Sequence, residues 1–175
     1  MVSTKNLTTI ALITALICIV SPFSIPIGPI PVSLASFIIM LAFAVFKLKK
    51  SLIAVCLYIL IGAVGVPVFS GFGAGVGKIA GPSGGFILGY ILMILAMGLV
   101  TFLTKKIKGK RYPLLISLIF GTIVLYISGS VWMSITSGLA YKEVLPLAVL
   151  PFILPDAAKI AAVYLISPRI SKVVR

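Results

Sequence analysis

Residues 151–166 read PFILPDAAKIAAVYLI, a run whose only charged residues are Asp156 and Lys159. The run predicts a membrane-embedded helix, because sustained apolar sequence at about 1.5 Å rise per residue is how helices cross a bilayer. Asp156 is one of only two acids in the chain. A charged side chain in hydrocarbon costs between about 3 and more than 10 kcal/mol. We therefore expect both residues to face protein, water or a ligand.

The whole chain has the composition of a multi-spanning membrane protein. Of its 175 residues, 61% are hydrophobic and 10% are charged, and the mean hydropathy is +1.31. A soluble domain with so little polar surface would expose large apolar patches and aggregate. We expect an all-α integral membrane protein in the lipid bilayer, forming a single domain over residues 1–175.

Apolar segments separated by proline-rich, glycine-rich or basic connections predict six transmembrane helices. Several are shorter than the roughly 20 residues of a full span, so we expect tilted helices or ends extended by loops. The segments are Leu7–Val20, Ser33–Phe46, Ser51–Val64, Gly84–Leu103, Pro113–Trp132 and Pro151–Ile166.

The basic residues predict the orientation of these helices. Lysine and arginine concentrate in cytoplasmic connections. The outer connections contain only Lys78 and Lys142, and this asymmetry places both termini in the cytoplasm. The expected inner set comprises Lys5, Lys47, Lys49, Lys50, Lys105, Lys106, Lys108, Lys110, Arg111, Arg169, Lys172 and Arg175. A cleaved signal peptide over the first segment is disfavoured, because no small-x-small cleavage site precedes the following prolines. Removal of that segment would also place the basic loops and the basic carboxyl-terminal tail on opposite sides of the membrane.

Composition also excludes several functional classes. The net charge of +13 lies beside apolar runs and forms no nucleic-acid-binding face. Cys18 and Cys56 sit in separate apolar segments, so no disulfide is expected. The chain has no histidine, so we predict no metal site and no Ser-His-Asp or Cys-His catalytic site.

The glycine-rich connection 65–86 is predicted to line a pocket. Gly77-Lys78 resembles the end of a phosphate-binding loop, but Phe72 replaces the first glycine of that pattern and Ile79 replaces its Ser or Thr. A flexible linker is the alternative, although the segment is too apolar for one and irregular backbone near a membrane must be buried or line a cavity. The candidate residues are Gly73, Lys78, Ser83, Gly84, Gly85 and Phe86.

Two further pairs of residues remain open to more than one interpretation. Ala11 and Ala15 have the small-xxx-small spacing that suits helix packing, either within the chain or against a partner. Asp156 and Lys159 share one helical face, about 8 and 12 Å below the outer end of a helix that starts at Pro151. A structural salt bridge is one interpretation, and contact with a polar solute is the one we favour.

Several stretches together resemble the BioY family, the biotin-specific S components of energy-coupling factor (ECF) transporters. The resemblance covers nearly the whole chain. The matching stretches are Ala11-xxx-Ala15, Ile25–Val32, Gly65–Phe69, Gly81–Phe86 and Pro151–Lys159. It implies a protein of a bacterial or archaeal cytoplasmic membrane that works with a membrane-embedded coupling protein and two cytosolic ATPases.

Carried to this sequence, the resemblance implies that Asp156 and Lys159 contact biotin, beneath the glycine-rich loop. It implies that Ala11 and Ala15 face the coupling protein. Some family members have Asn near Gly73, Arg at Ile87 and Gln near Ala35, and this chain lacks all three. An S component for another small vitamin therefore stays as an alternative, as does a small membrane enzyme or channel that uses Asp156.

Overall fold

A computed structural model describes residues 4–26, 30–106 and 112–174 of the chain. Gly28 and Pro29 of the proline-rich connection lie outside the described residues, as do four of the predicted cytoplasmic charges. Those four are Lys108, Lys110, Arg111 and Arg175.

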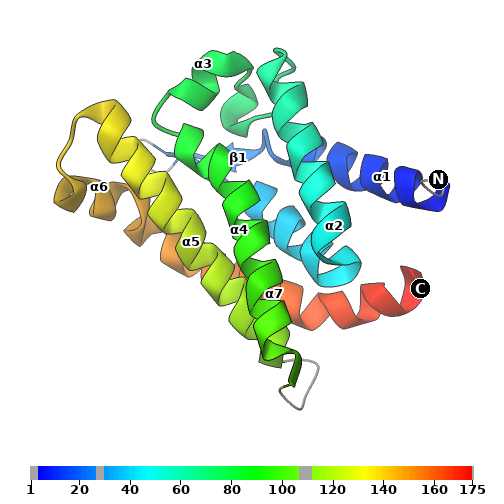
Figure 1. The fold of residues 1–175 in the computed structure, drawn as a ribbon. Helices are drawn as coiled ribbons and strands as arrows, with labels where there is room; N and C mark the ends of the chain where they lie inside the picture. The colour runs from blue at the N-terminus through cyan, green and yellow to red at the C-terminus, as the bar shows by residue number, and fades with distance from the viewer. Residues whose placement is uncertain (1–3, 27–29, 107–111, 175) are drawn as a thin grey trace.

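The described chain is mostly helical, with two very short strands (Figure 1). The helices are α1 Thr4–Val20, α2 Ala35–Ala63, α3 Gly75–Ala80, α4 Gly84–Leu103, α5 Tyr112–Ser137, α6 Tyr141–Ala148 and α7 Leu150–Val174, and the strands are β1 Ser24–Ile25 and β2 Val32–Ser33. Short 3-10 turns cover Ser70–Phe72 and Thr104–Lys106. The strands form an antiparallel pair that closes the proline-rich connection, a detail that the all-α prediction omitted.

Among the residues that the structure describes, three helices, α4, α5 and α7, are long and apolar enough to cross a membrane. The predicted bounds of the fourth segment coincide with α4. The fifth and sixth segments were predicted too short, because α5 continues to Ser137 and α7 continues to Val174. In α7 the helix passes through Pro168 and ends among basic residues, where composition alone predicts a boundary.

The second and third predicted segments correspond to the two limbs of α2, although Ser33, Leu34 and Val64 lie outside the helix. Its helical assignment runs through the basic connection and contains a break at Lys47, where φ is 67° and ψ is −175°. That geometry lies outside the helical region, so the chain turns sharply there (Figure 1). Each limb of α2 is shorter than the roughly 20 residues of a full span.

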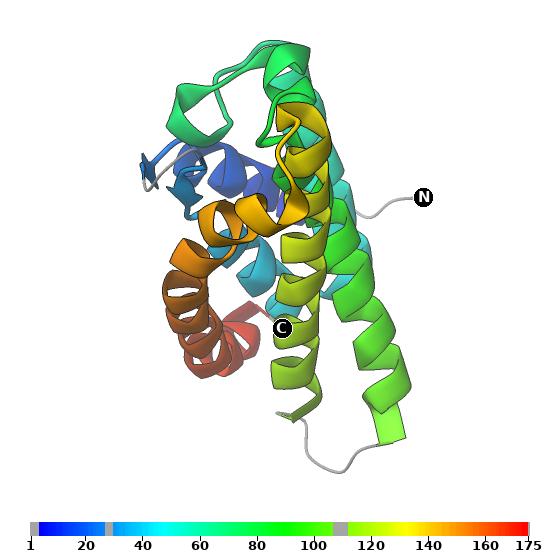
Figure 2. The same cartoon turned by 90° about the vertical axis from the view of Figure 1, so that its left-hand side faces the viewer.

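Close packing of α4 against α5 forms one wall of the bundle, visible edge-on in Figure 2. Glycines make this approach possible: a Cβ on Gly121 would overlap the side chain of Met97, and one on Gly129 would overlap the ring of Phe86. The short helices α3 and α6 adjoin the beginning of α4 and the end of α5, and thus gather at one end of this pair (Figure 1). The functional candidates lie near that end.

Candidate functional site

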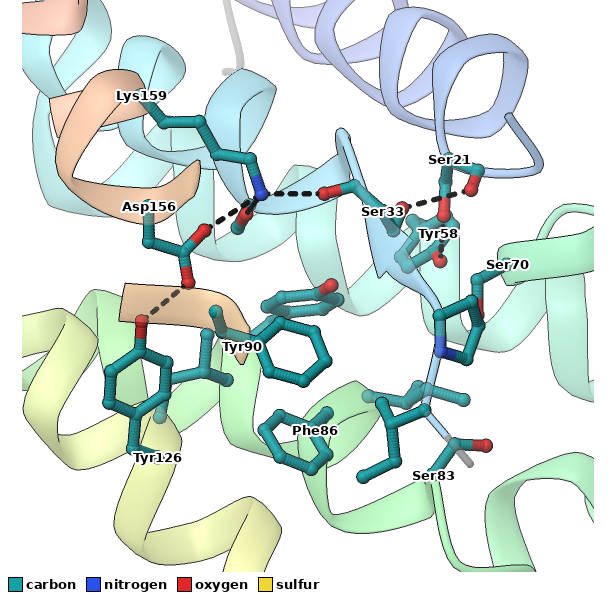
Figure 3. Close-up of a pocket in the computed structure, with 16 residues that line it drawn as sticks. Ser21, Ser33, Tyr58, Ser70, Ser83, Phe86, Tyr90, Tyr126, Asp156 and Lys159 are labelled. Atoms are coloured by element: carbon teal, nitrogen blue, oxygen red, sulfur yellow. Dashed lines mark hydrogen bonds and ion pairs between the residues drawn. The ribbon is translucent and has the colours of Figure 1, made fainter. Parts of the chain in front are cut away.

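A small buried cavity lies where α2, α4, α5 and α7 meet the connections at that end (Figure 3). Its volume is about 40 Å³. A charged pair, several hydroxyl groups and an apolar wall make up its lining. The lining residues are Ser21, Ile30, Pro31, Ser33, Ser36, Tyr58, Ser70, Ser83, Phe86, Ile87, Tyr90, Leu125, Tyr126, Phe152, Asp156 and Lys159.

Asp156 and Lys159 form a buried ion pair on α7. The Lys159 Nζ atom lies 2.7 Å from Asp156 Oδ1, and the two residues are 8% and 3% exposed. Their spacing of three residues brings both side chains to one face of the helix, as the sequence predicts. The pair borders the cavity, so a solute there would meet two opposite charges screened little by water.

Lys159 also connects α7 to the beginning of α2. Its ammonium group donates to the Ser33 carbonyl oxygen at 2.8 Å and to Ser36 Oγ at 3.0 Å (Figure 3). With Asp156, these acceptors match the three hydrogens of the ammonium group. The lysine is therefore fully hydrogen-bonded within the protein, and its bonds extend beyond the helix that carries it.

Asp156 has a second donor on the neighbouring helix α5. The Tyr126 hydroxyl donates to Asp156 Oδ2 at 2.8 Å. Each carboxylate oxygen thus accepts one hydrogen bond, whereas an ionised carboxylate offers about four acceptor positions in total. Asp156 keeps unused acceptor capacity at the edge of the cavity.

A cluster of hydroxyl groups lies on the side of the proline-rich connection. Ser21 Oγ and the Tyr58 hydroxyl are 2.6 Å apart, and Ser33 Oγ donates to the Ser21 carbonyl oxygen at 2.9 Å. These bonds join the end of α1, strand β2 and the second limb of α2. They hold the Ser33 carbonyl in place as an acceptor for Lys159.

Aromatic and aliphatic side chains form the apolar wall. The rings of Phe86 and Phe152 stack with centroids 6.1 Å apart and an interplanar angle of 21°. Phe86 reaches this position because Gly129 of α5 has no side chain in its path. Ile87 and Leu125 extend the wall. The site therefore combines a flat apolar surface with charged and hydroxyl groups on the other side.

The predicted site residues divide into two groups. Asp156, Lys159, Ser83 and Phe86 line the cavity, whereas Gly73, Lys78, Gly84 and Gly85 are not among its lining residues. The Lys78 side chain packs over Gly73, where an added Cβ would lie 2.9 Å from Lys78 Cε.

Gly84 and Gly85 have a packing role in this structure. They lie against Trp132 of α5, and a Cβ on Gly85 would overlap that side chain. The indole nitrogen of Trp132 donates to the Gly81 carbonyl at 3.1 Å. These contacts fix the start of α4 against α5.

Four further polar residues line the cavity and were not among the predicted site residues: Tyr126, Tyr58, Ser33 and Ser36. The sequence does contain a signal for such residues, because a hydroxyl-bearing side chain inside an apolar membrane segment needs a hydrogen-bonding partner. Ile87 lines the cavity as an apolar residue.

These features define a class: a helical protein with helices long and apolar enough to cross a membrane, and with a small cavity lined by polar and aromatic side chains. Within the described residues, no three His, Cys, Asp or Glu side chains gather as a metal site would require.

The model of the BioY family matches residues 1–175, and the chain belongs to this family.

Individual relatives are similar along almost the whole chain. The "probable biotin transporter BioY" of Pyrococcus horikoshii is 34% identical over 167 residues, which cover 95% of this chain and 96% of that protein. The "biotin transporter BioY2" of Lactococcus lactis subsp. cremoris is 34% identical, over 88% of this chain and 83% of its own length. The relatives bear the names of transporters and not of enzymes.

One solved structure has the same fold. It is the crystal structure of the S-component for biotin from an ECF-type ABC transporter, with a TM-score of 0.86 and 30% sequence identity. The match covers 96% of this chain and 91% of that one.

Proposed function

We propose that this protein binds biotin and serves as the substrate-specific S component of an ECF-type transporter. The observation that carries the proposal is the unused acceptor capacity of Asp156, placed at a cavity with a stacked aromatic wall. The family and the solved biotin S-component support the same ligand.

The chemistry of biotin suits both sides of this site. Its ureido ring donates two N–H groups, which an ionised Asp156 can accept. Its thioether ring and acyl chain are apolar and match the wall formed by Phe86 and Phe152. Lys159 already donates to three acceptors, so its principal role is to orient the Asp156 carboxylate.

Binding also requires the cavity to enlarge. Small-molecule pockets commonly enclose about 300 to 1,000 Å³. The cavity here, at about 40 Å³, has room for roughly three water molecules. Ser21, Ser33, Ser70 and Ser83 line it from the connections between helices, and these segments can move with less loss of packing than the helices can.

The proposed setting is a bacterial or archaeal cytoplasmic membrane. The chain would form one six-span domain over residues 1–175 with both termini in the cytoplasm, each limb of α2 counting as one span. Transport would require a membrane-embedded coupling protein and two cytosolic ATPases. Ala11 and Ala15 lie on the exposed face of α1, which makes them available to the coupling protein.

Calorimetric titration of the purified chain in detergent tests this proposal. We expect saturable binding of biotin and no measurable binding of thiamine or riboflavin. Binding of another vitamin in place of biotin would favour the alternative S-component assignment. Failure of all three ligands to bind a folded, monodisperse preparation would refute the proposed function.

A further inference from the structure

A second hollow lies at the opposite end of the bundle from α3 and α6, near the two termini. In Figure 1 the start of α1, the break in α2 and the end of α7 all lie on the right-hand side. Lys5, Asn6, Lys47, Lys50 and Ser171 contribute its polar lining. Three separate parts of the chain therefore bring their cationic and neutral polar side chains to one place.

These lysines have no anionic partner within the described residues. The chain contains only two acidic side chains. Asp156 is bound by Lys159 and Tyr126, and Glu143 of α6 accepts a hydrogen bond from the backbone N–H of Ala140, the residue just before that helix. Like charges gathered without a counter-charge repel each other, so an external anion would stabilise this arrangement.

The basic hollow continues into an apolar groove. Thr9, Val45 and Phe46 line both. The groove has a volume of about 330 Å³ and is otherwise lined by Leu12, Ile13, Leu16, Ile38, Leu41, Ala42 and Ile170. Along α1 the spacing from Thr9 to Leu16 corresponds to about 10 Å of groove.

We propose that this composite site binds one anionic phospholipid. The phosphate would lie among Lys5, Lys47 and Lys50, and an acyl chain would follow the groove past Leu12 and Leu16. A single phospholipid suits both features, because its phosphate can contact the cationic cluster and its acyl chain can contact the apolar wall beside it. Basic pockets between membrane helices on the cytoplasmic side recognise lipid headgroups in this way. This inference does not depend on the ligand of the other cavity.

Native mass spectrometry of the delipidated full chain tests the site. Phosphatidylglycerol should bind with one-to-one stoichiometry, at least tenfold more tightly than phosphatidylcholine. Each lysine near an anionic headgroup contributes about fivefold in affinity. The triple variant Lys5→Gln, Lys47→Gln, Lys50→Gln should therefore lose at least tenfold in affinity for phosphatidylglycerol.

A matched triple variant controls for net charge. Lys49→Gln, Lys105→Gln and Lys172→Gln remove the same charge from residues that do not line this hollow. This variant should keep phosphatidylglycerol affinity within about threefold. Equal losses in the two variants would overturn the proposal and indicate a nonspecific charge effect. Circular dichroism and size-exclusion profiles show whether each variant is folded.

A second variant tests the groove without altering charge. Leu12→Trp fills it and should also weaken phosphatidylglycerol binding at least tenfold, which keeps the test decisive if the lysine variant fails to fold. Unchanged binding in Leu12→Trp would contradict the acyl-chain placement. Competition by millimolar glycerol phosphate would show that the site takes a free anion and would overturn the lipid assignment. The lipid assignment would also be overturned if the protein showed no preference among lipids and this groove cross-linked to a coupling protein.

Discussion

The buried pair on α7 gives the sharpest prediction for ligand binding. Asp156→Asn preserves the size of the side chain and an oxygen acceptor for Tyr126, but it removes the negative charge. Leaving a buried hydrogen-bonding partner of Asp156 unsatisfied should cost about 1 to 3 kcal/mol of binding free energy. The affinity for biotin should therefore fall roughly 5- to 150-fold. Lys159→Ala should weaken binding by a comparable factor, because the Asp156 carboxylate then keeps only the Tyr126 donor.

Stability measurements separate ligand contact from a purely structural role. Lys159→Ala leaves a carboxylate that is 3% exposed without its ammonium partner, which should destabilise the fold by about 3 to 5 kcal/mol. Replacing both residues, as in Asp156→Asn with Lys159→Met, should cost less than the sum of the two single changes, since no unpaired charge remains. Chemical unfolding in mixed micelles measures these differences.

Calorimetric titration of each folded variant with biotin completes the experiment. Lys78→Ala is the control, because this lysine does not line the cavity and should keep wild-type affinity. Unchanged affinity in both Asp156→Asn and Lys159→Ala would refute the site, and the pair would then be a structural salt bridge only. An Asp156→Asn protein that kept its biotin affinity but lost a chemical activity would favour the membrane-enzyme alternative.

Three further predictions follow from particular contacts. Tyr126→Phe removes one hydrogen bond to the charged group of Asp156. Chemical unfolding should show a free energy of unfolding lower by about 1.5 to 3 kcal/mol. An unchanged free energy of unfolding would show that this hydrogen bond does not stabilise the protein. Gly129→Val should displace the Phe86 ring, because the added side chain would overlap it. The variant should be destabilised by about 1 to 3 kcal/mol and should bind biotin more weakly. Unchanged stability and affinity would contradict this packing of Phe86 against Gly129. Ala11→Trp should impair co-purification with a coupling protein and leave biotin titration unchanged; lost titration would instead indicate internal packing.

Parts of the fold follow directly from the sequence because they depend on local properties. The bounds of α4 coincide with its apolar run, since glycines begin it and polar residues end it. The break in α2 lies at Lys47, within the basic connection that the sequence predicts between its second and third segments, and the two limbs of α2 correspond to those segments. The ends of α5 and α7 were not predictable in this way, because polar and proline residues there remain helical.

Composition and residue spacing were enough to predict that the chain belongs in a membrane and that Asp156 and Lys159 share one helical face. Both conclusions depend on composition and on spacing within one helix. The partners that surround this pair become visible only in the folded protein. Ser33 is 126 residues away from Lys159, and Tyr126 is 30 residues away from Asp156. Helical periodicity specifies which side chains share a face, but the partners across the bundle depend on how the helices pack.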